Sequence, residues 1–401
     1  MTYPHAMPDV RPVFEWLVDA APGCVTSQDV VGALGDRLRG AGLPIDRMTI
    51  FVSTLHPTVH GRVFFWQPGE AVDVRELPHA FFSLPGFTNS PIHEVLTTRA
   101  SVREHVAPGP GPRRYPFYDE LADGGFTDYL ALPMVFTSGE THGAAFATRR
   151  ADGFSPDDVV ALERIMRPLT RLAEIFALRR NAVNLLSTYV GHDSGERILS
   201  GRIRRGDIET LRAVIWFSDL RGFTEMSARS TARDVIDALN VAFECQVAAV
   251  LRGGGEVLKF MGDGMLAIFP FADDAALSAT CDRALDAADE ALAELADKSR
   301  ERDGELRVGL ALHVGELAYG NIGGADRLDF TAIGAAVNLT ARLEGLTGKL
   351  GESVVVSREV AGATRRVCTS LGTFDLKGVP APVEVLAPRA PRPGESVTIE
   401  K

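Results

Sequence analysis

Strand-like and helix-like patterns alternate along the second half of the chain in an order that few folds accommodate. The patterns read strand, helix, strand, strand, helix, strand, at residues 212–219, 231–251, 256–260, 265–269, 275–298 and 306–314. This βαββαβ order is the ferredoxin-like plan. A further helix at 332–346 and short strands at 353–356 and 383–386 would complete an α+β domain over residues 205–388. The Pro-rich tail, 389–401, is predicted to be disordered.

Two aspartates stand where this plan would bring them together. Asp219 ends an apolar strand, and Asp263 lies at the tip of a tight hairpin, residues 259–264. If the two strands are neighbours, the carboxylates meet at one edge of the sheet and repel each other unless a cation joins them. Carboxylate oxygens near phosphate suit Mg²⁺ or Mn²⁺, and a pair of such ions can activate one oxygen and stabilise another. The alternative is that each aspartate only makes local backbone bonds in its turn.

Three sequence blocks that include these aspartates resemble a known family. Residues 217–224 (FSDLRGFT), 259–264 (KFMGDG) and 331–343 (TAIGAAVNLTARL) are similar, in order and spacing, to the signature blocks of the class III nucleotidyl cyclases. The resemblance covers roughly residues 205–387. It implies a phosphorus–oxygen lyase, and the purine-binding positions favour an adenylate cyclase that converts ATP to 3′,5′-cyclic AMP and pyrophosphate.

The resemblance implies a role for each matching position. Asp219, Leu220 and Asp263 would hold two Mg²⁺ or Mn²⁺ ions in each active site. Asn338 would orient the ribose, and Arg342 would stabilise charge on the reacting phosphate; because they are four residues apart, these two share a helix face. The remaining positions expected to bind substrate are Lys259, Thr331, Lys377, Phe223 and Thr224.

Two of these positions carry the prediction of ATP as substrate. The ammonium of Lys259 only donates hydrogen bonds, which suits the ring-nitrogen acceptors of adenine and not the N1–H and amino donors of guanine. The hydroxyl of Thr331 can accept from the adenine amino group, and threonine at this position marks a known subgroup of the family. Resembling guanylate cyclases usually carry Glu and Cys here. The chain has only five lysines, so a chance surface lysine at position 259 is the weaker interpretation.

Resembling cyclases build each active site between two catalytic domains. One domain supplies the metal carboxylates, and the other supplies the purine pair, the asparagine and the arginine. This chain carries each set once, so the resemblance implies a head-to-tail homodimer with two equivalent sites. The rival hypothesis is a degenerate cyclase that only binds nucleotide or a partner, but no chemistry-bearing residue of the set is missing.

The first 155 residues show a different pattern of strands and helices. Strand patterns at 50–52 and 63–66 would flank a turn at 60–62, and two more strands are expected at 129–136 and 143–148. Helix patterns flank them, so we expect an α+β domain with a mostly antiparallel sheet. Residues 125–133 (GFTDYLALP), followed by 153–157 (GFSPD), loosely resemble a GAF-type sensor domain, which implies regulation by an unidentified ligand. A purely dimerising role is the alternative.

A helical connector is predicted over residues 156–204, between the two domains. Ser155 can cap the helix, and Pro156 suits its first position. Apolar residues then recur at spacings of three and four as far as Leu186, which is typical of a coiled coil. The alternative for its first half is a helix packed on its own domain, and Pro168 favours a kink or a frayed first turn.

Composition excludes several classes of partner. The net charge is −11, so the chain is repelled by nucleic acid and by anionic membrane surfaces. No run of 18 apolar residues is present, and the first residues lack the pattern of a signal peptide. The four cysteines are dispersed and form no CxxC pair. We therefore expect a cytoplasmic protein without a membrane or nucleic-acid partner.

Overall fold

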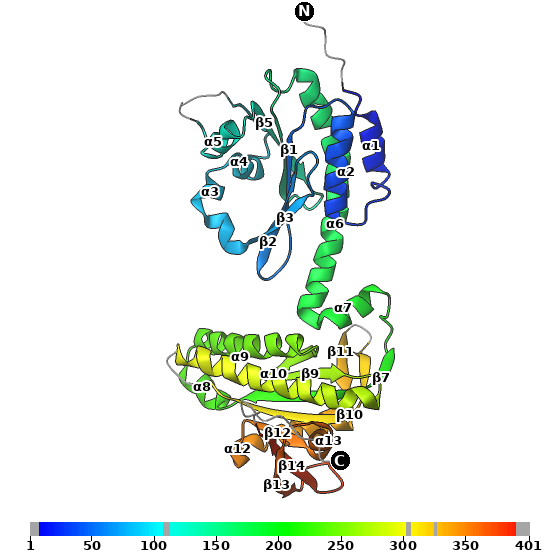
Figure 1. The fold of residues 1–401 in the computed structure, drawn as a ribbon, viewed down its shortest axis with the longest axis vertical. Helices are drawn as coiled ribbons and strands as arrows, with labels where there is room; N and C mark the ends of the chain where they lie inside the picture. The colour runs from blue at the N-terminus through cyan, green and yellow to red at the C-terminus, as the bar shows by residue number, and fades with distance from the viewer. Residues whose placement is uncertain (1–7, 107–112, 302–305, 325–326, 390–401) are drawn as a thin grey trace, which may run out of the picture. The chain divides into compact units, whose positions relative to one another are not determined.

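The computed structural model describes residues 8–106, 113–301, 306–324 and 327–389 (Figure 1). These residues form two compact units, Met1–Thr188 and Tyr189–Lys401. The expectations for the first residues of the chain, and for the tail beyond Arg389, lie outside the described residues. Within the described part of the chain, no helix is long and apolar enough to cross a membrane.

The first unit contains a six-stranded antiparallel sheet in the order β3-β2-β1-β6-β5-β4. Its strands are β1 (Arg47–Ser53), β2 (Val59–Trp66), β3 (Asp73–Pro78), β4 (Val102–His105), β5 (Asp128–Val135) and β6 (Thr141–Thr148). The turn expected at 60–62 is wrong, because these residues lie inside β2. Gly61 marks an irregularity in the pairing of β2 with β3, and a Cβ there would lie 2.7 Å from the Phe51 ring. Close packing, and not a turn, therefore requires this glycine.

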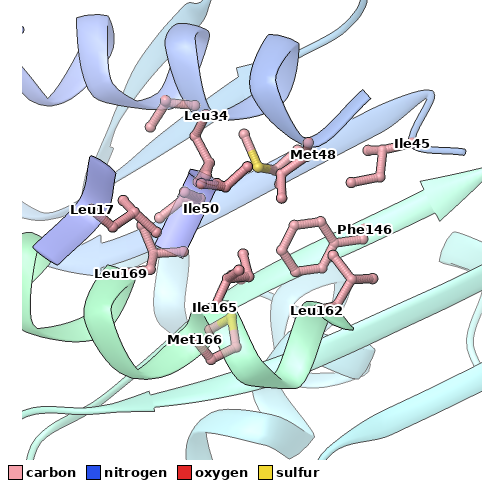
Figure 2. Close-up of a cluster of buried hydrophobic side chains, with 14 of the residues drawn as sticks. Leu17, Leu34, Ile45, Met48, Ile50, Phe146, Leu162, Ile165, Met166 and Leu169 are labelled. Carbon is pink, nitrogen blue, oxygen red and sulfur yellow. The ribbon is translucent and has the colours of Figure 1, made fainter. Parts of the chain in front are cut away.

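Helices cover both faces of this sheet (Figure 1). On one face lie α1 (Arg11–Val18), α2 (Ser27–Gly40) and the first part of α6 (Pro156–Val190). On the other lie η1 (His79–Ser83), α3 (Pro85–Thr88), α4 (Pro91–Thr98) and α5 (Phe117–Asp123). Figure 2 shows side chains of α1, α2, β1, β6 and α6 meeting in the core between the first set of helices and the sheet.

Helix α6 begins as the sequence predicts. Ser155 and Asp158 cap it reciprocally, with the Asp158 amide donating to Ser155 Oγ at 3.2 Å and the Ser155 amide donating to Asp158 Oδ2 at 2.8 Å. The helix continues through Pro168, and the apolar residues of its first half are buried in the first unit's core. The first half therefore packs on its own domain. The two compact units divide after Thr188, which lies within the connector predicted over residues 156–204.

The ferredoxin-like plan is present in the second unit. Strands β7 (Ile208–Leu220), β8 (Glu256–Met261), β9 (Gly264–Pro270) and β10 (Val308–Gly323) form an antiparallel sheet in the order β10-β7-β9-β8. Helices α9 (Ala232–Arg252) and α10 (Asp274–Arg300) lie side by side on one face (Figure 1). Both helix starts are capped, by Thr231 and Asp273, so the sequence determines where each begins.

Further elements extend this plan. The strands are β11 (Leu328–Ile333), which pairs with β10, β12 (Val354–Ser357), β13 (Cys368–Phe374) and β14 (Val383–Pro388). The helices are α7 (His192–Leu199), α8 (Phe223–Arg229), α11 (Ala335–Glu344), α12 (Thr347–Leu350) and α13 (Arg358–Ala363). Three expected bounds in this unit are wrong by three residues or more: the strand expected from 212 begins at 208, the strand expected to end at 314 continues to 323, and the helix expected from 332 begins at 335. The reason is tertiary, because β7 and β11 pair with the second half of β10.

Candidate active site

The two predicted aspartates meet at one edge of the central strands. Asp219 is the penultimate residue of β7, and its register partners are Gly264 on β9 and Gly309 on β10. Asp263 lies in the turn between β8 and β9, directly before Gly264. A Cβ at Gly264 would lie 3.0 Å from the Ser218 carbonyl oxygen, so the backbones approach closely here. The fold therefore brings the pair together as the sequence predicted.

The electrostatics of this pair suit a divalent cation. Burial, together with the charge of Asp263 and a hydrogen bond from it, raises the pKa of Asp219 to about 6. A cation between the carboxylates would remove this repulsion, and hard oxygen donors are what Mg²⁺ and Mn²⁺ prefer. Among the described residues, no cluster of three or more His, Cys, Asp or Glu side chains is arranged to hold a metal ion. The carboxylate donors at this edge fit metals that take their other ligands from phosphate and water.

A third acid lies close to the pair, and sequence reasoning missed it. Glu344 is the last residue of α11, and a Cβ at Gly309 would lie 2.6 Å from its Oε1. Burial first, and then the charges of Asp219 and Asp263, raise the pKa of Glu344 to about 7. The Thr347 hydroxyl donates to Glu344 Oε1 at 3.3 Å. Its position two residues after Arg342 was visible in the sequence, but only the fold places it against Gly309.

The segment after Asp219 is largely structural. The Leu220 side chain is buried in a cluster with Ala242, Cys245 and Val308, so only its backbone is available to a metal. The predicted substrate-binding residue Phe223 packs against the same cluster. Thr224 is exposed near the start of α8. Substrate contacts for Phe223 and Thr224 stay predictions.

The predicted purine pair lies on two strands that contact each other, β8 and β11. Lys259 is half-buried on β8 and forms no hydrogen bond or ion pair with the described residues. Thr331 on β11 is 6% exposed, and its hydroxyl oxygen is buried without a hydrogen-bond partner among the described residues. A buried hydroxyl without a partner costs about 1–3 kcal/mol, so this position suits a polar ligand atom.

The remaining predicted residues face outward. Asn338 and Arg342 are exposed on α11, whose buried side carries Ala336, Val337 and Leu343. In the described part of the chain, neither side chain contacts Asp219 or Asp263 through a hydrogen bond or ion pair. Lys377 is exposed in the turn between β13 and β14. Within the residues that the structure describes, one chain therefore brings the acids together, and the side chains of Asn338, Arg342 and Lys377 form no hydrogen bond or ion pair.

Comparison with known proteins identifies the class of this domain. Residues 209–385 match the family described as the adenylate and guanylate cyclase catalytic domain. This part of the chain is therefore a catalytic domain of the class III adenylate/guanylate cyclases, as the three sequence blocks predicted.

Individual relatives include both cyclase types. An adenylate cyclase of Anabaena cylindrica is 33% identical over 166 residues, which are 39% of this chain and 32% of the relative. The structure of the adenylyl cyclase CyaB from P. aeruginosa is 24% identical and covers 47% of this chain and 100% of its own, with a TM-score of 0.41. The guanylyl cyclase Cya2 is 26% identical and covers 49% of this chain and 100% of its own, with a TM-score of 0.40. The chain spans about a third to two-fifths of the length of the curated relatives it matches first.

Proposed function

We propose that this protein is an adenylate cyclase of the threonine-containing subgroup, which converts ATP to 3′,5′-cyclic AMP and pyrophosphate. The observation that carries the proposal is that the ammonium of Lys259, which can only donate, and the buried Thr331 hydroxyl, which has no hydrogen-bond partner among the described residues, lie on two strands that contact each other. The Thr331 hydroxyl would accept from the adenine amino group, while the Lys259 ammonium donates to a ring nitrogen. Guanine would present donors to the lysine, which cannot accept.

The proposed reaction is attack of the ribose 3′-oxygen on the α-phosphorus, with pyrophosphate leaving. Asp219 and Asp263, with the Leu220 backbone, would hold two Mg²⁺ or Mn²⁺ ions, which supply activation of the 3′-hydroxyl and neutralisation of the phosphates when bound. Asn338 would orient the ribose, and Arg342 would balance the charge that develops on the α-phosphate. Positioning and charge neutralisation supply most of the catalysis in such transfers. Among the other predicted contacts, Lys377 would bind the terminal phosphates.

We propose further that the site is shared between two copies in a head-to-tail homodimer. Asn338 and Arg342 are exposed and do not reach the acids of their own chain, which supports a site completed by a second copy. Mixing Asp219→Ala and Arg342→Ala proteins tests this, because each is inactive alone and one intact site can form in the mixed dimer. Recovery to about a quarter of wild-type activity is expected from random pairing; no recovery would rule out the shared site.

Substrate choice is tested by assaying the full chain with Mn²⁺-ATP and Mn²⁺-GTP and separating the cyclic products by chromatography. Cyclic AMP is the expected main product. Cyclic GMP as the main product would overturn the roles given to Lys259 and Thr331. Formation of neither product, with nucleotide still bound, would favour the binding-only alternative.

For the first unit we propose a GAF-like sensor that regulates the cyclase in cytoplasmic signalling, where ATP and Mg²⁺ are present. A cavity of about 660 Å³ lies on the sheet face that carries α3, α4 and α5, large enough for a small ligand. Its lining combines aromatic rings with charged groups, including Phe65, Phe117, Arg47 and Glu120. A small-molecule screen by thermal shift, followed by cyclase assays, tests this: a ligand that stabilises the protein should also change the cyclase rate.

A further inference from the structure

Three polar side chains that the proposed mechanism does not use meet at the entry to the catalytic domain. Ser194 of α7 lies with its Oγ 2.5 Å from the Tyr319 hydroxyl on β10. The Tyr319 hydroxyl donates to Glu256 Oε1 on β8 at 2.7 Å. Ser194 and Tyr319 are each 1% exposed. Because the tyrosine hydrogen points to Glu256, the serine must donate to the tyrosine oxygen, and the three groups form one directed chain.

Neighbouring residues hold the hydrogen-bonded series Ser194–Tyr319–Glu256 in place. The Arg197 guanidinium lies over the Tyr319 ring at 5.2 Å from its centroid, and the Phe330 ring meets the Tyr319 ring edge-on with centroids 4.8 Å apart. Gly191, with φ +92°, leads into α7, and a Cβ there would lie 3.2 Å from the Val257 carbonyl oxygen. Helix α7 is therefore packed against β8 as well as hydrogen-bonded to β10.

These hydrogen bonds join β8, which carries Lys259, to β10, which pairs with the strand that carries Thr331. Glu256 is the first residue of β8, and Lys259 follows it on the same strand. On β10, Tyr319 is the register partner of Ala332, and Gly320 is the partner of Thr331 on β11. In the sheet, β7 and β9 lie between β10 and β8, so backbone hydrogen bonds connect these two strands only through two intervening strands. The Tyr319–Glu256 hydrogen bond joins them directly.

We infer that Tyr319 and Glu256 are positioning residues for the purine pocket, and that Ser194 connects them to α7, the helix by which the chain enters the catalytic domain. The inference rests on the proposed function, because that function assigns the purine contacts to Lys259 and Thr331. Removing the Tyr319–Glu256 hydrogen bond leaves the acids and Arg342 in place, and leaves the positions of β8 and β11 to their apolar packing alone, without the polar contact that fixes their register. The loss therefore falls on nucleotide binding and on the preference for ATP over GTP, more than on the chemical step.

The decisive variant is Tyr319→Phe, which removes the hydroxyl and keeps the ring contacts. We expect KM for ATP to rise about tenfold, as for the loss of one hydrogen bond to a charged group, with kcat within about twofold and the ATP:GTP ratio of kcat/KM reduced. Tyr189→Phe is the matched control, because Tyr189 is 80% exposed. Glu256→Gln keeps an acceptor oxygen and should retain most of the wild-type KM, whereas Glu256→Ala should match Tyr319→Phe.

The combined variants separate positioning from stability. Tyr319→Phe with Glu256→Ala should raise KM no further than either change alone, because both remove the same bond. Ser194→Ala should give a smaller change in the same direction. If these variants lower Tm and kcat together and leave KM and the ATP:GTP ratio unchanged, the residues are only structural and the inference is wrong.

A binding measurement distinguishes failure of this inference from failure of the proposed function. If the wild-type protein forms no cyclic nucleotide, the affinities of Mn²⁺-ATP and Mn²⁺-GTP are measured by calorimetry. Weaker ATP binding and a smaller preference in Tyr319→Phe would then still support the positioning role. Equal affinities in wild type and variant, or no nucleotide binding by the wild type, would overturn it.

Discussion

Two groups of buried acids are treated in opposite ways, one in the first unit and one at the candidate active site of the second. In the first unit, Asp128 is fully buried and accepts from Arg103 Nη2 at 2.7 Å and from the Phe154 amide at 2.8 Å. Glu174 accepts from the Thr137 amide at 2.7 Å and pairs with Arg171. The hydrogen bonds from Thr137, and then this arginine, lower the pKa of Glu174. These carboxylates are satisfied inside the fold.

At the candidate active site of the second unit, Asp219 and Asp263 lie together, and their charges act on the nearby Glu344. Burial and mutual repulsion raise the pKa of Asp219 to about 6 and that of Glu344 to about 7. Acids of the first kind hold the chain together, whereas acids of the second kind store repulsion that a bound cation would relieve. The comparison teaches that a buried acid paired with a cation or with amide donors stabilises the fold, whereas buried acids that lie against each other need a ligand.

The largest expected effect comes from Asp219→Asn. Cyclase activity with Mn²⁺-ATP should fall by about 10³-fold or more, because one of the two proposed metal carboxylates is lost. The metal-free protein should nevertheless become more stable at pH 7 by about 1–2 kcal/mol, since a repelling buried charge is removed and solvent reduces the full effect. Urea unfolding with and without Mn²⁺ measures this. A variant less stable than wild type without metal would contradict the stored repulsion.

The matching change in the first unit is Asp128→Asn, and its effect should have the opposite sign. Removing the charge leaves the Arg103 guanidinium without its counter-ion, so the first unit should lose about 3 kcal/mol of unfolding free energy. Activity of the folded protein with ATP should change little if the first unit's ligand is absent. Urea unfolding at neutral pH provides the measurement. An unchanged midpoint would show that Asp128 is not structural.

Lowering the pH should change the unfolding free energies of the two units in opposite directions, each by about 1 kcal/mol. The raised pKa of Asp219 means that the folded state holds the proton more tightly, so this group favours folding at low pH and loses that contribution as the pH rises from about 4 to 6. Burial lowers the pKa of His142 to about 4, so its contribution is present above pH 6.5 and is lost as the pH falls toward 4.

Unfolding measured between pH 4 and pH 7 checks these signs. The difference in stability between wild type and Asp219→Asn should grow as the pH rises, and the difference between wild type and His142→Phe should shrink as the pH falls. His142 Nδ1 accepts from the Ser53 amide at 3.1 Å, which fixes the neutral tautomer in the folded state. Parallel pH profiles for both variants would contradict the comparison.

The smallest expected effect is that of Lys377→Ala. An exposed ammonium that meets the terminal phosphates contributes weakly, so KM for ATP should rise about threefold with kcat nearly unchanged. Lys298→Ala is the matched control, because Lys298 already pairs with Glu244 at 3.1 Å. Steady-state kinetics at two ionic strengths provides the readout, since added salt should reduce the difference between wild type and Lys377→Ala.

The sequence predicted the parts of the site that depend on local pattern. Asp219 ends a clear apolar strand and Asp263 lies at a hairpin tip, so their meeting follows from two short segments. The βαββαβ order was readable because each helix and strand keeps a strong period. The second half of β10 was missed because Gly315, Gly320 and Gly323 interrupt its alternation, and only pairing with β7 and β11 makes it a strand.

Contacts between distant residues could not be predicted. Glu344 and Gly309, or Ser194 and Tyr319, are far apart in the sequence, and their approach depends on the complete sheet. The orphaned hydroxyl of Thr331 was also invisible, since burial of one oxygen atom depends on everything packed around it. The chemical roles of the site residues could therefore be predicted from residue type and spacing. Which buried polar atoms have hydrogen-bond partners could be seen only in the folded structure.

The pairing of strand β10 with its neighbours restricts insertions and deletions in this part of the domain. Its sixteen residues pair with β7 along nearly their whole extent, with β12 on the other side of the first half, and with β11 beyond it. A substitution in such a strand leaves the alternation of its two faces intact, but one inserted or deleted residue reverses every side chain that follows. Within Val308–Gly323, a single-codon insertion would displace Tyr319 and the partner of Thr331 together, so natural variants should differ here in composition and not in residue number.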